Sequence, residues 1–377
     1  MNYKLKDICT RISSGKNKKS EEIKDAGKFP VYGGNGIRGF SDEYNFDGEC
    51  VIVGRQGANC GNVRYFAGKA YMTDHAVVIC TDEKTNTKYL SYLLSGLQLG
   101  RLSGQAAQPG ISVGVLSKQS IDLPSLDYQN KVVRKISLYD DLIANNNKRI
   151  KILEKMAENL YKEWFVRFRF PGYETAEFVD GVPKGWNRKI LKQLGDVVTG
   201  KTPSMEVDDN FGDEILFVKT PDMHGNMFVS DTSEKLSNKG HMTQPKKMIP
   251  ALSLMVSCIG TGGIVSINTK KCHTNQQINS IILRHNFYLE WAYFTCCGLR
   301  ETIEMFGATG TTMTNLSKGK FEKLKILMPN DEVICSFHEV ASPFFENILR
   351  LKELNHKLIK QRDLLLPRLM SGKIQLK

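Results

Sequence analysis

The chain has 377 residues, 41% of them hydrophobic and 24% charged, which is typical of a globular protein and excludes a low-complexity chain. This length predicts two or three domains. There are 52 Lys and Arg against 40 Asp and Glu, so the net charge is +12. An excess of this size favours a polyanionic partner, with nucleic acid the leading candidate, and solubility alone is the alternative.

The cysteines and the N-terminus bear on the cellular compartment. Nine cysteines without a C-x-x-C pair indicate reduced thiols in a cytosolic protein. The stretch "MNYKLKDICTRISSGK" lacks the apolar core of a signal peptide, and no apolar run approaches the ~20 residues of a membrane helix. Cys258, Cys272 and His273 match no zinc-finger spacing. The sequence therefore predicts a cytoplasmic protein with no metal site.

Residues 1–125 contain short apolar runs between Gly, Asn, Asp and Ser, such as "CVIVG" and "AVVIC", which predict strands joined by turns. Within them, "GGNGIRG" spells the dinucleotide pattern G-x-G-x-x-G from Gly34 to Gly39. A dinucleotide loop follows a buried strand and opens a helix. Here Pro30 interrupts the preceding run, and the following "FSDEYNFDGE" has no helical stripe. The glycines are therefore expected to form a tight turn on a β-rich domain.

Residues 126–170 and 330–377 carry apolar residues at alternating spacings of three and four, which is the seam of a coiled coil. Asn146 and Asn355 fall on seam positions, where a polar residue can fix the register. Ile143 and Ile348 are 205 residues apart, as are Leu153 and Leu358. We therefore expect two long helices that pack on each other as an antiparallel pair. Two independent amphipathic helices are the alternative.

Between these helices, residues 171–329 repeat the pattern of the first 125. "LKDICTRISSGK" corresponds to "LKQLGDVVTGK", "VIVGRQG" to "LMVSCIG", and "MTDHAVVIC" to "HTNQQINSIIL". The order is kept and the offset stays near 200 residues, which indicates a tandem duplication. The predicted fold is α+β, with two β-rich domains joined by two long helices and related by a pseudo-two-fold repeat.

A second nucleotide pattern, G-x-x-x-x-G-K-[ST], spans Gly195–Thr202. A P-loop requires a helix at its lysine, but Pro203 follows at once, and the corresponding "CTRISSGKN" lacks two of the required residues. A P-loop enzyme that uses this segment remains an alternative, to be tested by ATP binding to Lys201→Ala. The chain has no H-E-x-x-H motif. It also lacks the Asn/Asp-Pro-Pro-Tyr/Phe tetrapeptide of amino-methyltransferases. We therefore predict that it is not an enzyme.

The chain resembles the specificity (S) subunit of type I restriction-modification systems over nearly its whole length. The resemblance lies in these stretches, which follow the order of that family along the chain: "PVYGGNGIRGF", "LEKMAENLYKEWFVRF", "LGDVVTGKTPS", "HTNQQI", "TTMTNLSKGKFEKLKILMP" and "KQRDLLLPRLMSGKI". It implies two target recognition domains, each reading half of a bipartite DNA site, and two helices that dock two modification subunits. It also implies that S-adenosylmethionine, ATP and magnesium belong to the modification and restriction subunits, with no cofactor on this chain. An RNA-binding adaptor is the weaker alternative.

Base reading requires Arg, Lys, Asn or Gln on loops that a rigid scaffold positions. The predicted DNA-binding residues of the first domain are Asn35, Arg38, Arg55, Gln56, Asn59, Gln105 and Gln108. Those of the second domain are Lys219, Thr261, Asn275, Gln276, Gln277, Thr311 and Thr312. Each of these residues has the alternative role of shaping a turn or a helix cap.

The end of the first helical segment is both basic and aromatic. Seven Lys and Arg lie between Lys148 and Phe170, against three Glu, and they could neutralise DNA phosphates. The apolar residues of this segment and of the C-terminal helix favour protein docking instead. The predicted docking residues are Tyr161, Trp164, Phe165, Phe168, Leu365 and Leu369.

Overall fold

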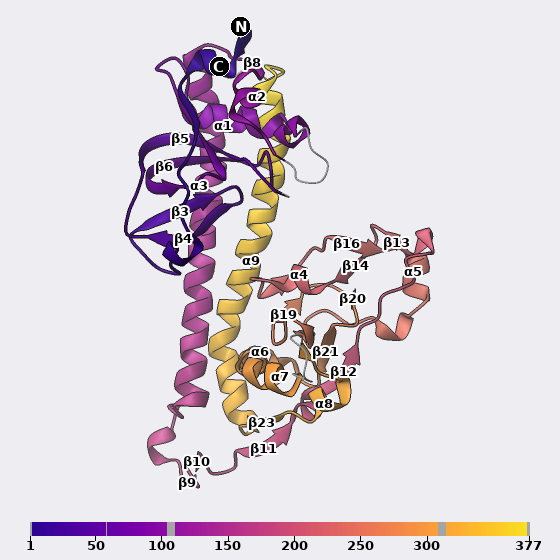
Figure 1. Ribbon diagram of the computed structural model, residues 1–377. Helices are drawn as coiled ribbons and strands as arrows, with labels where there is room; N and C mark the ends of the chain where they lie inside the picture. The colour runs from indigo at the N-terminus through magenta and orange to yellow at the C-terminus, as the bar shows by residue number, and fades with distance from the viewer. Residues whose placement is uncertain (1, 58, 104–109, 308–313, 375–377) are drawn as a thin grey trace. The chain divides into compact units, whose positions relative to one another are not determined.

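The computed structural model describes residues 2–57, 59–103, 110–307 and 314–374 (Figure 1). The chain divides into two compact units: unit 1 comprises Met1–Asn145 and Leu354–Lys377, and unit 2 comprises Asn146–Glu353. Each unit holds one β-rich domain together with part of each long helix. In the described ranges, no helix combines the length and apolar character that crossing a bilayer demands.

Unit 1 is built on a six-stranded sheet with the strand order β2-β7-β5-β6-β3-β4. The bounds are β2 (Cys9–Ser14), β3 (Phe29–Gly33), β4 (Gly36–Ser41), β5 (Phe46–Gly54), β6 (Val63–Met72) and β7 (Ala76–Thr81). A separate pair joins β1 (Asn2–Lys4) to β8 (Ser120–Asp122), and the short helices are α1 (Thr87–Gly96) and α2 (Val113–Ser117).

The central strand β5 is apolar on both faces because both faces of the sheet are covered. Val51 and Val53 lie in one buried cluster with α1 side chains such as Leu90. Cys50 and Ile52 point to the other face and lie in a second cluster. The period-2 alternation of a strand thus divides the run "CVIVG" between two cores.

Unit 2 contains a five-stranded sheet, β12-β21-β17-β19-β15, and a four-stranded sheet, β13-β16-β14-β20. The first sheet comprises β12 (Gly195–Thr199), β15 (Phe228–Val229), β17 (Leu254–Ser257), β19 (Val265–Asn268) and β21 (Ile278–Leu283). The second comprises β13 (Phe211–Gly212), β14 (Ile215–Val218), β16 (Glu234–Leu236) and β20 (Cys272–Thr274). The remaining strand pairs are β9 (Phe178–Val179) with β10 (Val182–Pro183), β11 (Asn187–Ile190) with β23 (Lys325–Met328), and β18 (Ile259–Gly260) with β22 (Thr314–Asn315).

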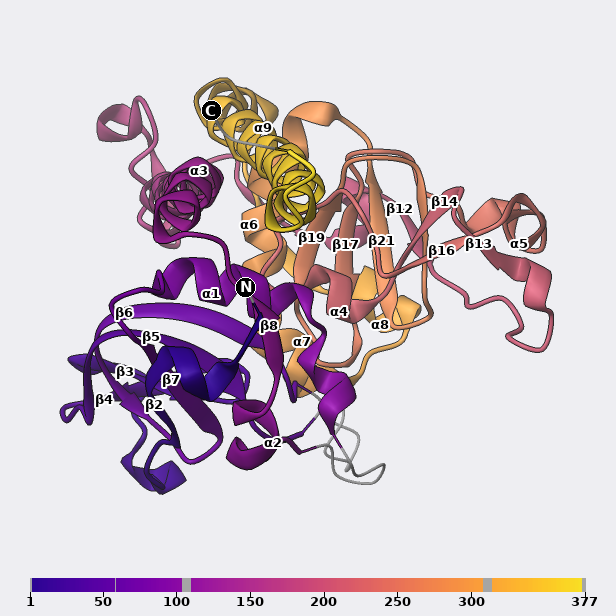
Figure 2. The same cartoon turned by 90° about the horizontal axis from the view of Figure 1, so that it is seen from above.

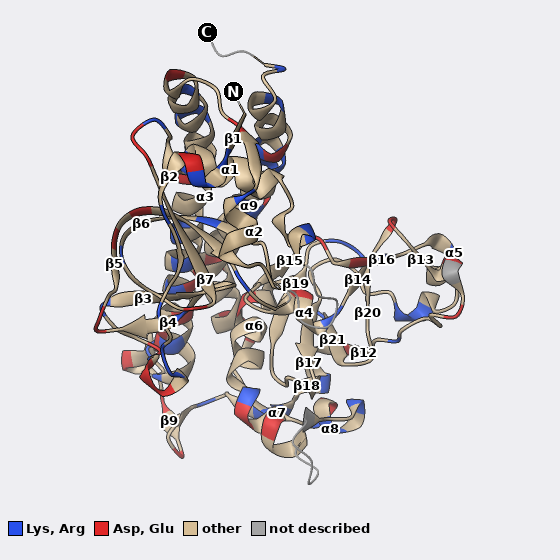
Figure 3. Cartoon of the chain, turned by 45° about the horizontal axis from the view of Figure 1, so that its top comes forward, with Lys and Arg blue, Asp and Glu red and all other residues tan. Residues whose placement is uncertain are grey.

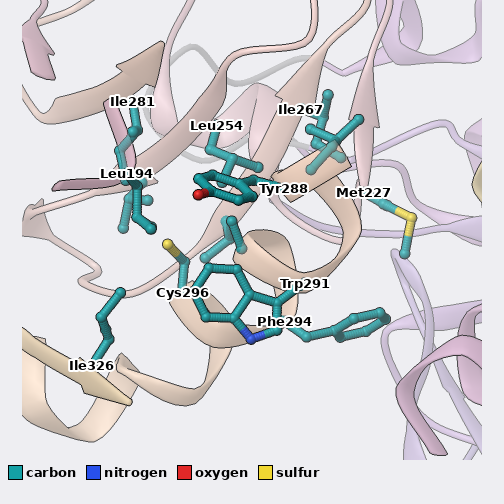
Figure 4. Close-up of a cluster of buried hydrophobic side chains, with 14 of the residues drawn as sticks. Leu194, Met227, Leu254, Ile267, Ile281, Tyr288, Trp291, Phe294, Cys296 and Ile326 are labelled. Carbon is teal, nitrogen blue, oxygen red and sulfur yellow. The ribbon is translucent and has the colours of Figure 1, made fainter. Parts of the chain in front are cut away.

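Short helices complete unit 2: α4 (Thr220–Met223), α5 (Asn238–Met242), α6 (Leu289–Gly298), α7 (Arg300–Gly307) and α8 (Lys318–Glu322). Figure 4 shows Trp291 and Tyr288 packed against the aliphatic side chains of the five-stranded sheet, including Leu254 and Ile281. Trp291 is 1% exposed, so α6 anchors this core.

Equivalent backbone hydrogen bonds confirm the tandem repeat. The Leu5 N–H donates to the Gln119 oxygen at 2.9 Å, and the Leu191 N–H donates to the Leu324 oxygen at 3.0 Å. The antiparallel pairs β2–β7 and β5–β7 correspond to β12–β21 and β17–β21. The parallel pair β3–β6 corresponds to β14–β20, so β14 is the second copy of β3.

Two long helices, α3 (Leu126–Tyr161) and α9 (Asp331–Met370), contribute to both units. In unit 1 the Tyr128 hydroxyl donates to the Leu369 oxygen at 2.9 Å. In unit 2 a π-helical turn, Lys162–Val166, follows α3, and its Trp164 ring lies 5.6 Å from that of Phe337. The start of each helix thus meets the end of the other, which confirms the antiparallel pair. Asn146 and Asn355 are both buried, as their seam positions predict.

Candidate nucleic-acid interface

In unit 1 the glycine-rich stretch forms the turn between β3 and β4. Gly36 has a φ of +102°, and a Cβ there would lie 3.1 Å from the guanidinium of Arg64. A Cβ on Gly34 would lie 3.2 Å from the backbone oxygen of His75. Asn35 is exposed at the tip, and its backbone oxygen accepts a hydrogen bond from Arg64 Nη2 at 3.1 Å. Strand β4 follows where a dinucleotide loop would open a helix, so the expected tight turn is confirmed.

The loop after β5 lies against this hairpin, since a Cβ on Gly34 would be 3.5 Å from the Gln56 oxygen. Gln56 is exposed, and so is Arg38 on β4. Arg55 is half-buried, with its Nη1 3.4 Å from the backbone oxygen of Asp74. A Cβ on Gly54 would lie 2.4 Å from the Gly34 oxygen and 2.5 Å from the Asn59 oxygen, and a Cβ on Gly33 would lie 2.5 Å from Arg38 Cδ. The five described candidates therefore gather where the two loops meet: Asn35, Arg38, Arg55, Gln56 and Asn59. Gln105 and Gln108 lie outside the described residues.

In unit 2 the segment after β20 forms a compact polar turn. Asn275 is 8% exposed, its Nδ2 donates to Gln277 Oε1 at 3.0 Å, and its Oδ1 accepts from the Gln277 N–H at 3.2 Å. The Thr220 hydroxyl also donates to Gln277 Oε1, at 3.1 Å. Asn275 therefore shapes the turn from inside, the structural alternative to base reading. The sequence alone could not distinguish these two roles.

The other candidates of unit 2 surround this turn and differ in their partners. Gln276 is exposed, and its Oε1 accepts a hydrogen bond from the Thr202 hydroxyl at 2.6 Å. Lys219 forms an ion pair with Glu234, which neutralises its charge locally. Thr261 is exposed, and its backbone oxygen accepts from the Ser257 hydroxyl at 2.6 Å. Thr311 and Thr312 lie outside the described residues.

The P-loop spelling has a structural explanation. Residues Gly195–Thr199 form β12, and a Cβ on Gly200 would lie 2.2 Å from the backbone oxygens of Thr274 and Asn275. The N–H of Lys201 donates to the Thr274 oxygen at 3.0 Å, and residues 201–204 have no helical structure. The glycine thus serves close contact with the turn after β20, so the phosphate cradle of a P-loop is not formed.

Basic and acidic residues are interspersed in Figure 3, and the basic segment at the end of α3 is partly neutralised. Four of its seven cations form ion pairs with Glu158 or Glu163: Lys155, Lys162, Arg167 and Arg169. This pairing weakens the expectation that the whole segment contacts phosphates.

The predicted docking aromatics are mainly core residues. Trp164 and Phe165 are 7% and 8% exposed, and both rings pack on Phe337. Leu369 is fully buried in the same cluster as Ile136. These three side chains therefore give no exposed apolar surface to a partner, contrary to the prediction. Tyr161, Phe168 and Leu365 are partly buried against the same two cores.

A cavity of about 670 Å³ in unit 2 lies between α3 and α6, and its lining includes Met223, Tyr293 and Cys297. Burial raises the pKa of the Cys297 thiol to about 12, which is the opposite of what a thiolate nucleophile requires. The Cys297 thiol is therefore not activated as a nucleophile. In the described part of the chain, no group of three His, Cys, Asp or Glu side chains is placed to hold a metal ion.

Sequence reasoning missed two exposed cations beside these loops. Arg64 contacts the β3–β4 turn across the sheet, a contact between residues 29 positions apart that no local pattern reveals. Lys16 follows Gly15 as Lys201 follows Gly200, so the repeat itself carried a signal for it.

The fold and loops define a class of protein: a tandem repeat of one β-rich domain, with a long helix after each copy and polar loops on each domain. A family model described as the type I restriction modification DNA specificity domain matches residues 1–155 and 183–361. The chain therefore belongs to this family, as the resemblance predicted, and it is a DNA sequence-recognition subunit.

Individual relatives agree with this assignment. The chain is 33% identical over 327 residues to the type I restriction enzyme HindI specificity subunit of Haemophilus influenzae, covering 71% of each chain. It is 27% identical over 311 residues to the MjaIX specificity subunit of Methanocaldococcus jannaschii, covering 77% of this chain and 69% of that one. The crystal structure of an S subunit from M. genitalium has the same fold, with a TM-score of 0.61 at 14% identity over 98% and 95% of the two chains.

Proposed function

We propose that this chain reads a bipartite double-stranded DNA site, with each β-rich domain reading one half. It holds modification subunits that methylate adenine at N6, and restriction subunits join that complex. The observation that carries the proposal is the pair of equivalent loop clusters, one per domain, on the same strand framework. Their exposed side chains differ, with Arg38 and Gln56 in one and Gln276 and Thr261 in the other. Two different polar surfaces on one framework suit two different half-sites.

In this proposal the chain itself has no catalytic step and binds no cofactor. S-adenosylmethionine, ATP and magnesium belong to the partner subunits, and the complex acts in the cytoplasm.

Co-expression with candidate modification subunits, followed by mapping of methylated adenines, tests the proposal. We expect methylation in one two-part motif with a fixed spacer. Replacing residues 1–125 with another recognition domain should change one half of the motif. The matched replacement of residues 187–328 should change the other half only. Methylation without a motif, or a change in both halves after one exchange, would refute the proposal.

Arg38→Ala tests the reading of the first half-site by the β3–β4 hairpin. We expect weaker binding and relaxed preference at one position of that half, by ~1–3 kcal/mol for a bidentate base contact. Unchanged affinity and an unchanged motif would assign the hairpin a structural role only.

A further inference from the structure

The two domains of this chain can be compared with each other position by position, because their backbones share one hydrogen-bond pattern. The Arg55 N–H donates to the His75 oxygen at 2.9 Å, and the Cys258 N–H donates to the Gln277 oxygen at 2.7 Å. These bonds make the loop after β5 equivalent to the loop after β17, and the turn after β6 equivalent to the turn after β20.

Most side chains on these loops differ between the two copies. The backbone bonds pair the residues of the two loops as follows: Arg55 with Cys258, Gln56 with Ile259, Asp74 with Gln276, and His75 with Gln277. The equivalence of β3 and β14 also pairs Gly34 with Thr220. Base edges differ from one half-site to the next, whereas phosphates do not. Positions that differ between the copies therefore suit base reading, and a cation kept in both copies suits a phosphate.

One cation beside these loops is kept in both copies. The Gly15 and Lys16 N–H groups donate to the Ala76 and Met72 oxygens at 3.0 and 2.9 Å. The Gly200 and Lys201 N–H groups donate to the Ile278 and Thr274 oxygens at 3.1 and 3.0 Å. The backbone thus places a lysine at the same point of each domain, next to the turn whose side chains differ.

The glycine before each lysine is required by this placement. A Cβ on Gly15 would lie 2.1 Å from the Met72 oxygen, and a Cβ on Gly200 would lie 2.2 Å from the Thr274 oxygen. The close approach fixes the direction in which the chain leaves β2 and β12. The lysine after each glycine therefore starts from a rigid backbone position.

Both lysines are exposed, and among the described residues neither Nζ has an ion pair or a hydrogen-bond partner. In unit 2 the neighbouring Thr202 donates to Gln276, so Lys201 lies at the border of the variable turn. Lys219, which has no lysine counterpart in unit 1, is by contrast already paired with Glu234.

We propose that Lys16 and Lys201 each bind a DNA phosphate at the same place in the two half-sites, while the differing turns after β6 and β20 select the bases. This inference rests on the proposed function, since it presumes that each domain meets one half-site. The two lysines then supply affinity and register but no sequence preference.

The chain provides a matched control. Lys118 and Lys323 are also equivalent, exposed and without an ion pair among the described residues. Lys118 precedes Gln119, whose oxygen accepts from the Leu5 N–H, and Lys323 precedes Leu324, whose oxygen accepts from the Leu191 N–H. Leu5 and Leu191 come before β2 and β12, whereas Lys16 and Lys201 follow these strands. The control lysines therefore lie at the opposite end of each strand. Lys118→Ala/Lys323→Ala therefore removes the same charge from equivalent positions away from the loops.

The test measures the salt dependence of DNA binding by the complex of this chain with its modification subunits. Fluorescence anisotropy with the cognate duplex and a duplex altered in both halves gives log K against log salt for each. Lys16→Ala/Lys201→Ala should reduce the slope on both duplexes by ~1.8, which is ~0.9 per phosphate contact. The affinity ratio between the two duplexes should stay unchanged, and Lys16→Arg/Lys201→Arg should restore the slope.

The control pair should leave the slope at its wild-type value. An unchanged slope in Lys16→Ala/Lys201→Ala would overturn the proposal, as would a loss of affinity confined to the cognate duplex, which would make the lysines base readers. Equal binding of both duplexes by the wild-type complex would instead refute the proposed function. The lysine slope would still be measured on either duplex in that case.

Discussion

One seam position of the helix pair is polar in unit 1 and apolar in unit 2. In unit 1, Arg362 Nη1 lies 2.9 Å from Asp140 Oδ1, and the Tyr92 hydroxyl donates to the other oxygen of Asp140. The 205-residue offset of the helices relates Asp140 to Phe345 and Arg362 to Ala157.

Burial, and then the hydrogen bond to Asp140, raise the pKa of Tyr92, so this hydroxyl remains a donor at neutral pH. Unit 2 fills the same place with Phe345 and Ala157 beside Phe294, which is the counterpart of Tyr92 on α6. The Phe294 and Phe345 rings lie 5.8 Å apart.

Asp140→Ala should destabilise unit 1, because it removes the acceptor that the Tyr92 hydroxyl shares with Arg362, whose remaining ion pair is with the exposed Asp363. Breaking a fully buried ion pair costs ~3–5 kcal/mol, and an exposed pair contributes at most ~1 kcal/mol. The Arg362 and Asp140 side chains are 28% and 26% exposed, so we expect a loss of ~2 kcal/mol in the free energy of unfolding. The triple variant Tyr92→Phe/Asp140→Phe/Arg362→Ala copies the apolar solution of unit 2 and should stay within ~1 kcal/mol of wild type.

Urea unfolding provides the assay, since all three tryptophans, Trp164, Trp186 and Trp291, lie in unit 2. Far-UV circular dichroism follows both units, whereas tryptophan fluorescence follows unit 2 only. Asp140→Ala should shift the dichroism transition more than the fluorescence transition. The reasoning is refuted if Asp140→Ala is neutral, or if the triple variant loses as much stability as the single one.

Three further changes probe the cores and turns of unit 2. Trp164→Ala should lower its free energy of unfolding by ~3–5 kcal/mol in the same urea assay, because the ring is 7% exposed in the main cluster, and a loss below ~1 kcal/mol would contradict its core role. Gly200→Ala should lower the free energy of unfolding by ~2 kcal/mol or more, because its Cβ would meet two backbone oxygens at 2.2 Å. Gly298→Ala, whose Cβ would have nothing within 4 Å, should change it by less than ~1 kcal/mol. Equal effects of the two changes on thermal unfolding would exclude this steric account. Burial, and then His241, lower the pKa of His273 from 6.5 to about 4, so the folded state binds fewer protons than the unfolded state between these values. The free energy of unfolding should therefore fall by up to ~3 kcal/mol as the pH falls from 6.5 towards 4. His273→Gln should make the urea midpoint depend less on pH over this range. A midpoint with the same pH dependence as wild type would show that His273 is not the cause.

The sequence was sufficient for the architecture because the signals there are periodic and occur twice. The seam spacing of α3 and α9 required two helices that share a face, and their common offset pointed to pairing. The run "CVIVG" became β5 because its alternate residues enter two cores. Both nucleotide patterns failed in context, and the glycines Gly34 and Gly200 prove to contact backbone oxygens instead.

Roles that depend on a distant partner could not be derived from the sequence. An apolar residue at a helix end gives the same signal whether it enters the protein core or an exposed interface, so Trp164 and Phe165 were assigned to docking. Asn275 satisfies a turn that includes Gln277, and Lys219 is neutralised by Glu234, 15 residues further along the chain. The Lys219–Glu234 contact follows from the pairing of β14 with β16, two strands that a residue-by-residue pattern does not show to be neighbours.

The way in which the framework is stabilised explains how one fold can carry two different recognition surfaces. Backbone hydrogen bonds and the glycine contacts of Gly15 and Gly200 hold the turn after β6 and the turn after β20. In the turn after β20, the side chains of Asn275, Gln276 and Gln277 add hydrogen bonds of their own. Substitution of an exposed loop side chain such as Gln56 should therefore change stability by no more than ~0.5 kcal/mol. Replacement of Gln276 also removes the acceptor of the Thr202 hydroxyl. A new half-site preference can then arise by exchange of loop residues while each core stays intact. Asn275 is the exception: it is buried and hydrogen-bonded within the turn, so its replacement would alter the loop itself.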